Sequence, residues 1–185
     1  EAFLEAVALD YRHGDAHFGL GLAEFGRGDL EAALFVFNEL TRLDSDRFDG
    51  HYNRGVTLAR LGRPGDAAEA FRTAIANLEP KVTLREAVDA WVGLASQLNA
   101  AMDHAGAAEA YASARDLVEE DGAEAMELTY LWAQSLAYAG RGLEALPELN
   151  ELDAEVSDHR VSSLIAEIYL DQGQVDYAVR SLERG

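Results

Sequence analysis

The sequence contains no cysteine, so disulfide bonds and thiol chemistry are excluded. No run of apolar residues approaches the roughly 20 that a membrane-spanning helix needs. Basic residues are scarce: Lys81 is the only lysine, and 15 lysine and arginine residues face 34 aspartate and glutamate residues, a net charge of −19. Nucleic acids and membrane insertion are therefore disfavoured, because nucleic acids and anionic lipids attract basic proteins. A basic or apolar protein segment is the favoured kind of partner.

Catalytic motifs are also missing. The Gly19-Leu20-Gly21 and Gly26-Arg27-Gly28 stretches follow no predicted strand, so they do not qualify as phosphate-binding loops. Asp10, His13 and His17 could be drawn as a metal cluster, because the two histidines lie one helical turn apart. The simpler interpretation is that His17 fills an aromatic packing position. We predict no enzyme activity, no metal and no cofactor.

The stretch from Asp49 to Pro80 contains two amphipathic helical segments. Apolar and small residues recur at spacings of three and four in each half, which is typical of a helix with one buried face. Gly62-Arg63-Pro64-Gly65 separates the halves, and Pro80 ends the second. Gly55 lies inside the first helix, where glycine costs ~1 kcal/mol relative to alanine. Close approach of a second helix explains its presence.

This hairpin recurs along the chain. Phe3, Phe37 and Phe71 are each 34 residues apart, and the same interval separates Gly21 from Gly55, Gly28 from Gly62 and Ala33 from Ala67. A helical hairpin repeated every ~34 residues is typical of the tetratricopeptide repeat. His17, His51 and Trp91 occupy one position of successive copies, four residues before the small residue of the first helix.

The chain resembles a tetratricopeptide repeat (TPR) protein over nearly its whole length. The third copy matches the family motif best, with Trp91, Leu94, Ala95 and Leu98, then Ala107, Tyr111 and Ala114. The resemblance implies an all-α fold, an α-solenoid of stacked antiparallel helix pairs that forms a right-handed superhelix. It implies one domain over 1–185, divided as 1–14 (second helix of a partial repeat), 15–47, 48–81, 84–121 and 122–157 (full repeats), and 158–185 (last repeat, cut near its end).

The repeat spacing lengthens to 40 residues between Ala67 and Ala107 and to 38 between Ala107 and Ala145. Thr83-Leu84-Arg85-Glu86 has the capping-box pattern, so the third repeat should begin near Leu84. The fourth should begin near Gly122, and each extension should add one to two helical turns. If the helix that contains Pro147 started at Leu143, the proline would remove one of its early hydrogen bonds, so we favour a start near Ala145.

In this family the first helices line a concave groove in which peptides lie. Spacing from the small residue of each repeat gives the residues expected on that face: Phe18, Leu22, Phe25, Tyr52, Asn53, Val56, Arg60, Ser96, Asn99, Tyr130, Gln134, Tyr138 and Glu167. Aromatic rings and amides suit peptide recognition, although some of these side chains should pack between helices instead. The carboxylate clamp of some family members is rejected, because Phe18 and Leu22 stand where basic residues would be needed.

We therefore predict a non-enzymatic protein-interaction scaffold that binds a basic or apolar peptide. Two alternatives stay open: a homo-oligomerising module, and an adaptor arm of an enzyme whose catalytic domain lies outside this sequence. Both ends cut through a repeat, which favours a piece of a longer protein or an end that pairs with another copy. The composition indicates a bacterial source. The cytoplasm is the expected location, with the periplasm as the alternative.

Overall fold

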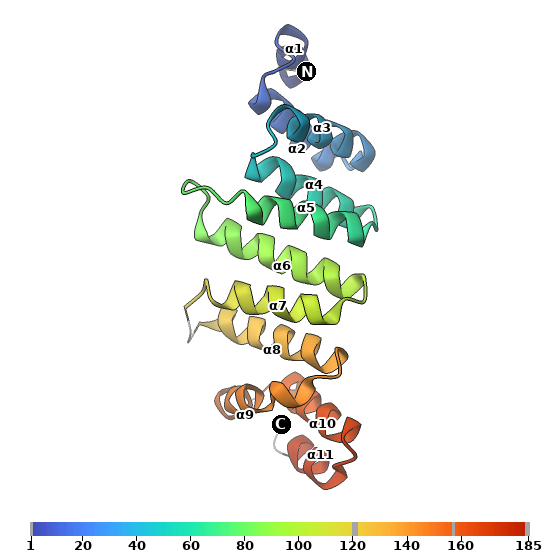
Figure 1. The fold of residues 1–185 in the computed structure, drawn as a ribbon, viewed down its shortest axis with the longest axis vertical. Helices are drawn as coiled ribbons and strands as arrows, with labels where there is room; N and C mark the ends of the chain where they lie inside the picture. Colours follow the sequence, from blue (N-terminus) through green and yellow to red (C-terminus); the bar gives the residue numbers. More distant parts are fainter. Residues whose placement is uncertain (1, 120–121, 157, 184–185) are drawn as a thin grey trace. The chain divides into compact units, whose positions relative to one another are not determined.

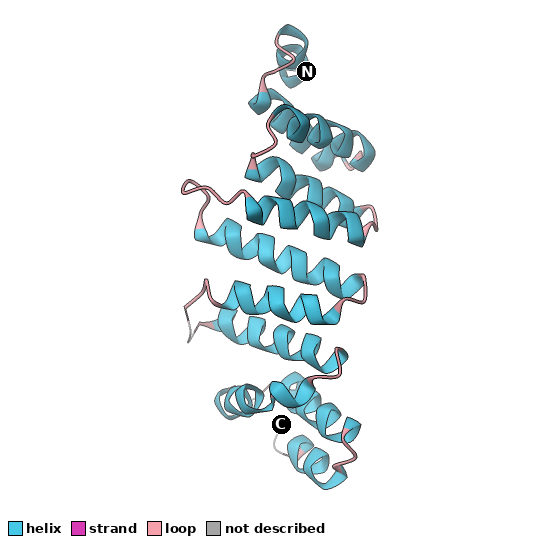
Figure 2. Ribbon diagram, in the orientation of Figure 1, coloured by secondary structure: helices cyan, strands magenta, loops and turns pink. Residues whose placement is uncertain are grey.

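The computed structural model describes residues 2–119, 122–156 and 158–183, and all regular structure within these ranges is helical (Figure 2). The helices are α1 (Ala2–Leu9), α2 (Gly14–Arg27), α3 (Leu30–Leu43), α4 (Phe48–Arg60), α5 (Pro64–Ala76), α6 (Leu84–Ala100), α7 (His104–Arg115), α8 (Ala123–Tyr138), the 3-10 helix η1 (Gly142–Glu144), α9 (Leu146–Glu155), α10 (His159–Asp171) and α11 (Val175–Leu182). The predicted all-α class is confirmed. None of the described helices is long and apolar enough to span a membrane.

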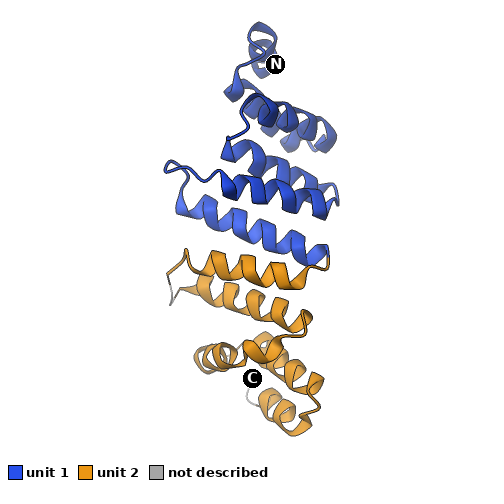
Figure 3. Cartoon of the chain, viewed as in Figure 1, with its two compact units in different colours: residues 1–101 blue, residues 102–185 orange. Residues whose placement is uncertain are grey.

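The chain divides into two compact units, Glu1–Ala101 and Met102–Gly185, which Figure 3 distinguishes by colour. The division falls in the turn between α6 and α7, inside the third predicted repeat. Each unit contains complete helical hairpins, and each is described separately below.

In the first unit, α2 packs on α3 and α4 on α5, while α3 contacts α4 and α5 contacts α6 (Figure 1). The hairpins close because phenylalanine rings lie against glycine. A Cβ added to Gly21 would come within 2.5 Å of the Phe37 ring, and one on Gly55 within 3.1 Å of the Phe71 ring. Only a residue without a side chain allows such an approach. The predicted packing role of Gly55 is confirmed.

In the second unit, α7 packs on α8 and α10 on α11, and α9 contacts both α8 and α10. Leu149 of α9 and Ile165 of α10 are fully buried in its core. Figure 1 shows α9 nearly end-on where α7 and α8 run across the view, so α9 crosses them steeply. Helix α9 has only 10 residues, starts at Leu146 and carries Pro147 in its first turn. The predicted late start of this helix is confirmed.

The predicted helix starts of the third and fourth repeats are confirmed. Helix α6 begins at Leu84 behind the Thr83–Glu86 capping box, and α8 begins at Ala123 behind Gly122. With 17 and 16 residues against 13 in α4, α6 gains about one turn and α8 slightly less than one. The expected gain of one to two turns is wrong for α8, because only part of each insertion is helical.

The turns within the hairpins share a left-handed residue. Gly28, Gly62, Gly140 and Gly173 have φ between 70° and 83°, a conformation that glycine adopts without steric cost. The turn between α6 and α7 uses Met102 instead, at φ 65°. This methionine is 77% exposed, so little packing is visible to offset its backbone strain.

Candidate functional site

The groove residues predicted for the first unit lie on its first helices, α2, α4 and α6, and none is fully buried. Leu22 is 41% exposed, and Arg60 and Ser96 are also exposed. The half-buried members are Phe18, Phe25, Tyr52, Asn53, Val56 and Asn99. These side chains are therefore accessible in part while also contacting their own unit.

Several of these side chains have defined neighbours. The guanidinium carbon of Arg60 lies 5.0 Å from the centre of the Phe25 ring. The Tyr52 ring stacks on Phe48 at 5.8 Å and meets Phe71 edge-on at 5.7 Å, and burial raises the pKa of its hydroxyl. Asn53 donates from its amide nitrogen to the Asp49 carbonyl oxygen at 2.8 Å. The face is thus an ordered aromatic surface rather than a set of loose side chains.

In the second unit, the predicted residues lie on α8 and α10. Tyr130 and Gln134 are half-buried, and the amide nitrogen of Gln134 lies 3.4 Å from the Tyr130 hydroxyl. Tyr138 is 55% exposed, with its ring centre 5.4 Å from that of His104. Glu167 is exposed on α10.

An arginine links neighbouring first helices in the first unit. The guanidinium of Arg47, at the start of α4, lies 5.3 Å from the centre of the Phe18 ring of α2. It donates to Asp49 at 2.6 and 3.0 Å and to Asp15 of α2 at 2.8 Å. The hydrogen bond from Arg47 lowers the pKa of Asp15, and the one to Asp49 raises the pKa of Arg47. We call Asp15, Phe18, Arg47 and Asp49 the Arg47 clamp.

The second unit contains the same arrangement. Arg160, in the first turn of α10, lies 4.9 Å from the centre of the Tyr130 ring of α8. It donates to Glu127 of α8 and to Asp158, each at 2.9 Å, and its side-chain hydrogen bond to Asp158 lowers the pKa of that carboxyl group. Glu127, Tyr130, Asp158 and Arg160 form the Arg160 clamp. In both clamps an acidic residue precedes the aromatic residue by three positions, one helical turn.

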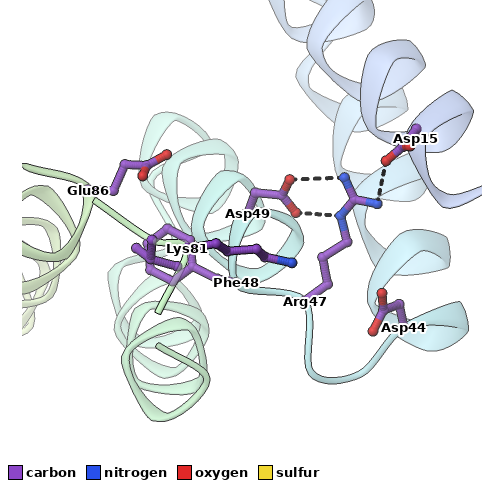
Figure 4. A pocket seen from close by; sticks show the side chains of 8 residues that line it. Asp15, Asp44, Arg47, Phe48, Asp49, Lys81 and Glu86 are labelled. Atoms are coloured by element: carbon purple, nitrogen blue, oxygen red, sulfur yellow. Dashed lines mark hydrogen bonds and ion pairs between the residues drawn. The ribbon is translucent and has the colours of Figure 1, made fainter. Parts of the chain in front are cut away.

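A cavity of about 340 Å³ lies beside the Arg47 clamp, at the N-terminal ends of α4 and α6 (Figure 4). Its lining combines four carboxylates, two basic side chains and two apolar ones: Asp15, Asp44, Asp49, Glu86, Arg47, Lys81, Phe48 and Val82. Figure 4 shows Arg47 turned toward Asp49 and Asp15, with Lys81 on the other side of Asp49. Carboxylates therefore outnumber cations at this edge of the predicted face.

The histidines have structural contacts. His17 and His51 are buried, and Nε2 of each donates to a carbonyl oxygen six residues earlier, of Tyr11 at 2.9 Å and of Ser45 at 2.8 Å. His13 instead caps α2 by accepting from the Ala16 amide. The packing interpretation of His17 is confirmed. In the part of the chain that the structure describes, no three His, Asp or Glu side chains are grouped to hold a metal ion.

Sequence reasoning missed both clamps. The spacing of the repeat motif predicts which residues share a face of one helix, whereas Arg47 and Arg160 contact the first helix of the preceding repeat. A signal was nevertheless present: Asp15 and Phe18, Asp49 and Tyr52, and Glu127 and Tyr130 all have the acid-x-x-aromatic pattern.

Comparison with known proteins agrees with this geometry. A family model described as tetratricopeptide repeat matches residues 1–48, 32–81 and 52–122. No match was found among curated proteins. The solved structure of YrrB, described as a TPR protein with an unusual peptide-binding site, is 18% identical over 100% of this chain and 90% of its own, with a TM-score of 0.80.

Two further solved structures share the fold. MamA is 17% identical over 89% of this chain and 91% of its own, with a TM-score of 0.71. PilW, described as a widely conserved type IV pilus biogenesis factor, is 16% identical over 97% of this chain and 79% of its own, with a TM-score of 0.63. At these identities the likeness shows the fold alone. On the family match and the recurring helical hairpin, the chain belongs to the tetratricopeptide repeat family.

Proposed function

We propose that the first-helix face of α2, α4 and α6 binds an extended or helical segment of a partner protein, without catalysis. The observation that carries this proposal is the accessible aromatic surface of Phe18, Phe25 and Tyr52, which lies beside exposed Leu22. Aromatic side chains provide large contact areas at low entropic cost. YrrB, which has this fold, is described as having a peptide-binding site.

The partner segment we propose is apolar with basic residues. Net charge is −19, and four carboxylates line the cavity beside Phe48 and Arg47. A basic side chain of the ligand would be attracted there, whereas an acidic tail would be repelled. Binding should then weaken as salt is raised, because exposed charges are screened within about 8 Å at 0.15 M salt. The cytoplasm remains our predicted location, with the periplasm as the alternative.

The proposal is tested with a peptide array of graded charge and hydropathy, followed by titration of the best binder. Leu22→Glu should weaken binding about tenfold or more, since it places a charge on the apolar face. The matched control is Phe35→Glu, because Phe35 is 67% exposed on the second helix α3. An array without binders, or equal losses in both variants, would contradict the proposal.

Self-association is the second candidate. Helix α11 exposes apolar side chains, namely Val175, Tyr177, Val179 and Leu182, each between 47% and 55% exposed. A second copy could cover this face by the hydrophobic effect. Light scattering over a concentration series checks it: a mass that stays monomeric at the highest concentration excludes this candidate.

A further inference from the structure

The fourth repeat lacks the large side chain that the first three place at one packing position. His17, His51 and Trp91 each precede the small residue of their first helix by four positions, and Thr129 stands at the same distance before Ala133. In the first unit, His17 and His51 are 3% and 8% exposed. Threonine is much smaller than histidine or tryptophan, and a packed interior compensates for lost volume only partly. A gap is therefore expected beside Thr129.

The structure has open space beside Thr129. Two adjoining hollows of about 560 and 480 Å³ lie between α7, α8 and α9 of the second unit. Both are lined by Ala125 and Thr129 of α8, by Arg115 of α7 and by Glu148 of α9. We call this space the Thr129 cleft.

The walls of the Thr129 cleft combine apolar side chains with charged ones, and polar atoms contribute more of its surface than apolar atoms. Met126 and Leu152 add apolar surface to one hollow, and Trp132, Ala112 and Val118 add it to the other. The hydroxyl of Thr129 donates to the Ala125 carbonyl oxygen at 2.8 Å, so its own helix already satisfies it. An aromatic ring that enters beside Thr129 would therefore leave no unpaired hydroxyl there, and Met126, Leu152 and Trp132 offer it apolar surface.

Charge at the rim is unbalanced. Arg115 lies 4.8 Å from the centre of the Trp132 ring and is ion-paired with Glu148. Three further carboxylates line the cleft: Asp116, Glu151 and Glu155. An incoming cation therefore meets carboxylates that Arg115 does not neutralise.

From this geometry we propose that the Thr129 cleft is a second binding site, which takes an aromatic side chain flanked by basic residues on a partner protein. The aromatic ring enters the open space beside Thr129, at the repeat position that carries histidine or tryptophan in the first three repeats. The flanking cations pair with Glu151 and Glu155, both exposed. The site lies on other helices than the face proposed above, so either proposal can fail alone.

The probe is the acetylated tripeptide amide Lys-Trp-Lys, titrated into the ¹⁵N-labelled 185-residue chain. Saturable shifts are expected at the backbone amides of Ala125 and Thr129. Two comparison peptides separate the contributions of charge and of the aromatic ring to binding. Glu-Trp-Glu keeps the ring but reverses the charges, and Lys-Ala-Lys keeps the charges but lacks the ring. Each should bind about tenfold more weakly or worse. Equal binding of either peptide, or no shift with Lys-Trp-Lys, overturns the proposal.

Variants of the chain complete the test. Thr129→Trp should abolish Lys-Trp-Lys binding by filling the cleft, whereas Thr129→Ser keeps the cleft and the binding. If Thr129→Trp does not fold, the double variant Glu151→Lys and Glu155→Lys replaces it. This variant reverses two exposed charges of the cleft and should also abolish Lys-Trp-Lys binding. Leu22→Glu, in the first unit, should leave binding unchanged. Shifts at Thr129 that appear on concentrating the protein alone would identify a second copy as the occupant and refute the proposal.

Discussion

Arg47 lies with its guanidinium carbon 5.3 Å from the centre of the Phe18 ring, so a charge at the start of α4 covers an aromatic side chain of α2. Its side chain is only 18% exposed, and two carboxylates hold it in place. A cation over an aromatic ring contributes about 0.5–2 kcal/mol, depending on desolvation. The contact therefore couples two successive repeats through one side chain.

We predict that Arg47→Met lowers the free energy of unfolding by about 1–2 kcal/mol, since it removes both the cation and its ion pairs. Chemical denaturation monitored by circular dichroism measures this. Arg47→Lys keeps the charge but not the paired hydrogen bonds to Asp49, so its loss should be intermediate. If Arg47→Met unfolds at the wild-type midpoint, the clamp does not couple the repeats.

Acid should weaken both clamps. Asp15 and Asp158 have folded-state pKa values below their ordinary value of 3.8. Their contribution is therefore complete above 3.8 and is lost as the pH falls through the lower folded-state values. Relief of the −19 net charge acts in the opposite direction, so the difference between variants is informative rather than the absolute curve.

The measurement compares the wild type with the double variant Asp15→Asn and Asp158→Asn. Their difference in unfolding free energy should be largest above about pH 5 and should shrink toward about pH 2. Glu109→Gln, an exposed substitution on α7 outside both clamps, is the charge control and should give a flat difference. A double-variant difference independent of pH would contradict the prediction.

Replacing Met102 by glycine should relieve the strain of its left-handed backbone conformation and stabilise the chain. Its φ of 65° is matched in the other hairpin turns by glycine, and a side chain in this region costs roughly 1–2 kcal/mol. Met102→Gly should therefore raise stability by about 1 kcal/mol after the added flexibility of the unfolded chain is subtracted. The reverse change at an equivalent turn, Gly62→Ala, should lower it. Thermal denaturation of the two variants checks this: the midpoint should rise for Met102→Gly and fall for Gly62→Ala relative to the wild type.

Two glycines of α2 should respond oppositely to alanine. A Cβ on Gly21 would lie 2.5 Å from the Phe37 ring, whereas one on Gly26 would have no neighbour within 4 Å. Gly21→Ala should destabilise the chain by about 1–3 kcal/mol through overpacking. Gly26→Ala should stabilise it by up to about 1 kcal/mol through helix propensity. Equal effects in denaturant titrations would show that Phe37 moves aside freely.

Local chemistry explains what the sequence could predict. The capping box at Thr83, the helix start near Gly122 and the position of Pro147 in a first turn all depend on neighbours within a few residues, and all three are confirmed. A packing role for Gly55 could be predicted because glycine inside a helix is costly and because the interval of 34 residues places Gly21 at the same position of the preceding copy.

Contacts between residues of different repeats could not be predicted from the sequence. The Arg47 clamp needs the rotation of α4 against α2, which no spacing within one helix gives. The Thr129 cleft is lined by residues of α7, α8 and α9 together, which no pattern within one helix predicts. The groove residues stay a prediction: their partial exposure is compatible with binding, but exposure alone does not distinguish a ligand contact from a surface side chain.

The two clamps mean that apolar contacts stabilise each hairpin, whereas ion pairs contribute to the contacts between neighbouring hairpins of a unit. Within a hairpin, the contacts of Phe37 with Gly21 and of Phe71 with Gly55 are apolar, so they are insensitive to ions. Between Asp15 and Arg47, and between Glu127 and Arg160, adjacent hairpins are joined in part by ion pairs that reach the solvent. The stability of a repeat protein is the sum of the stability of each hairpin and of the contacts between neighbouring hairpins. Added salt should therefore weaken the contacts between hairpins more than the hairpins themselves. Ionic strength thereby sets how many repeats unfold together.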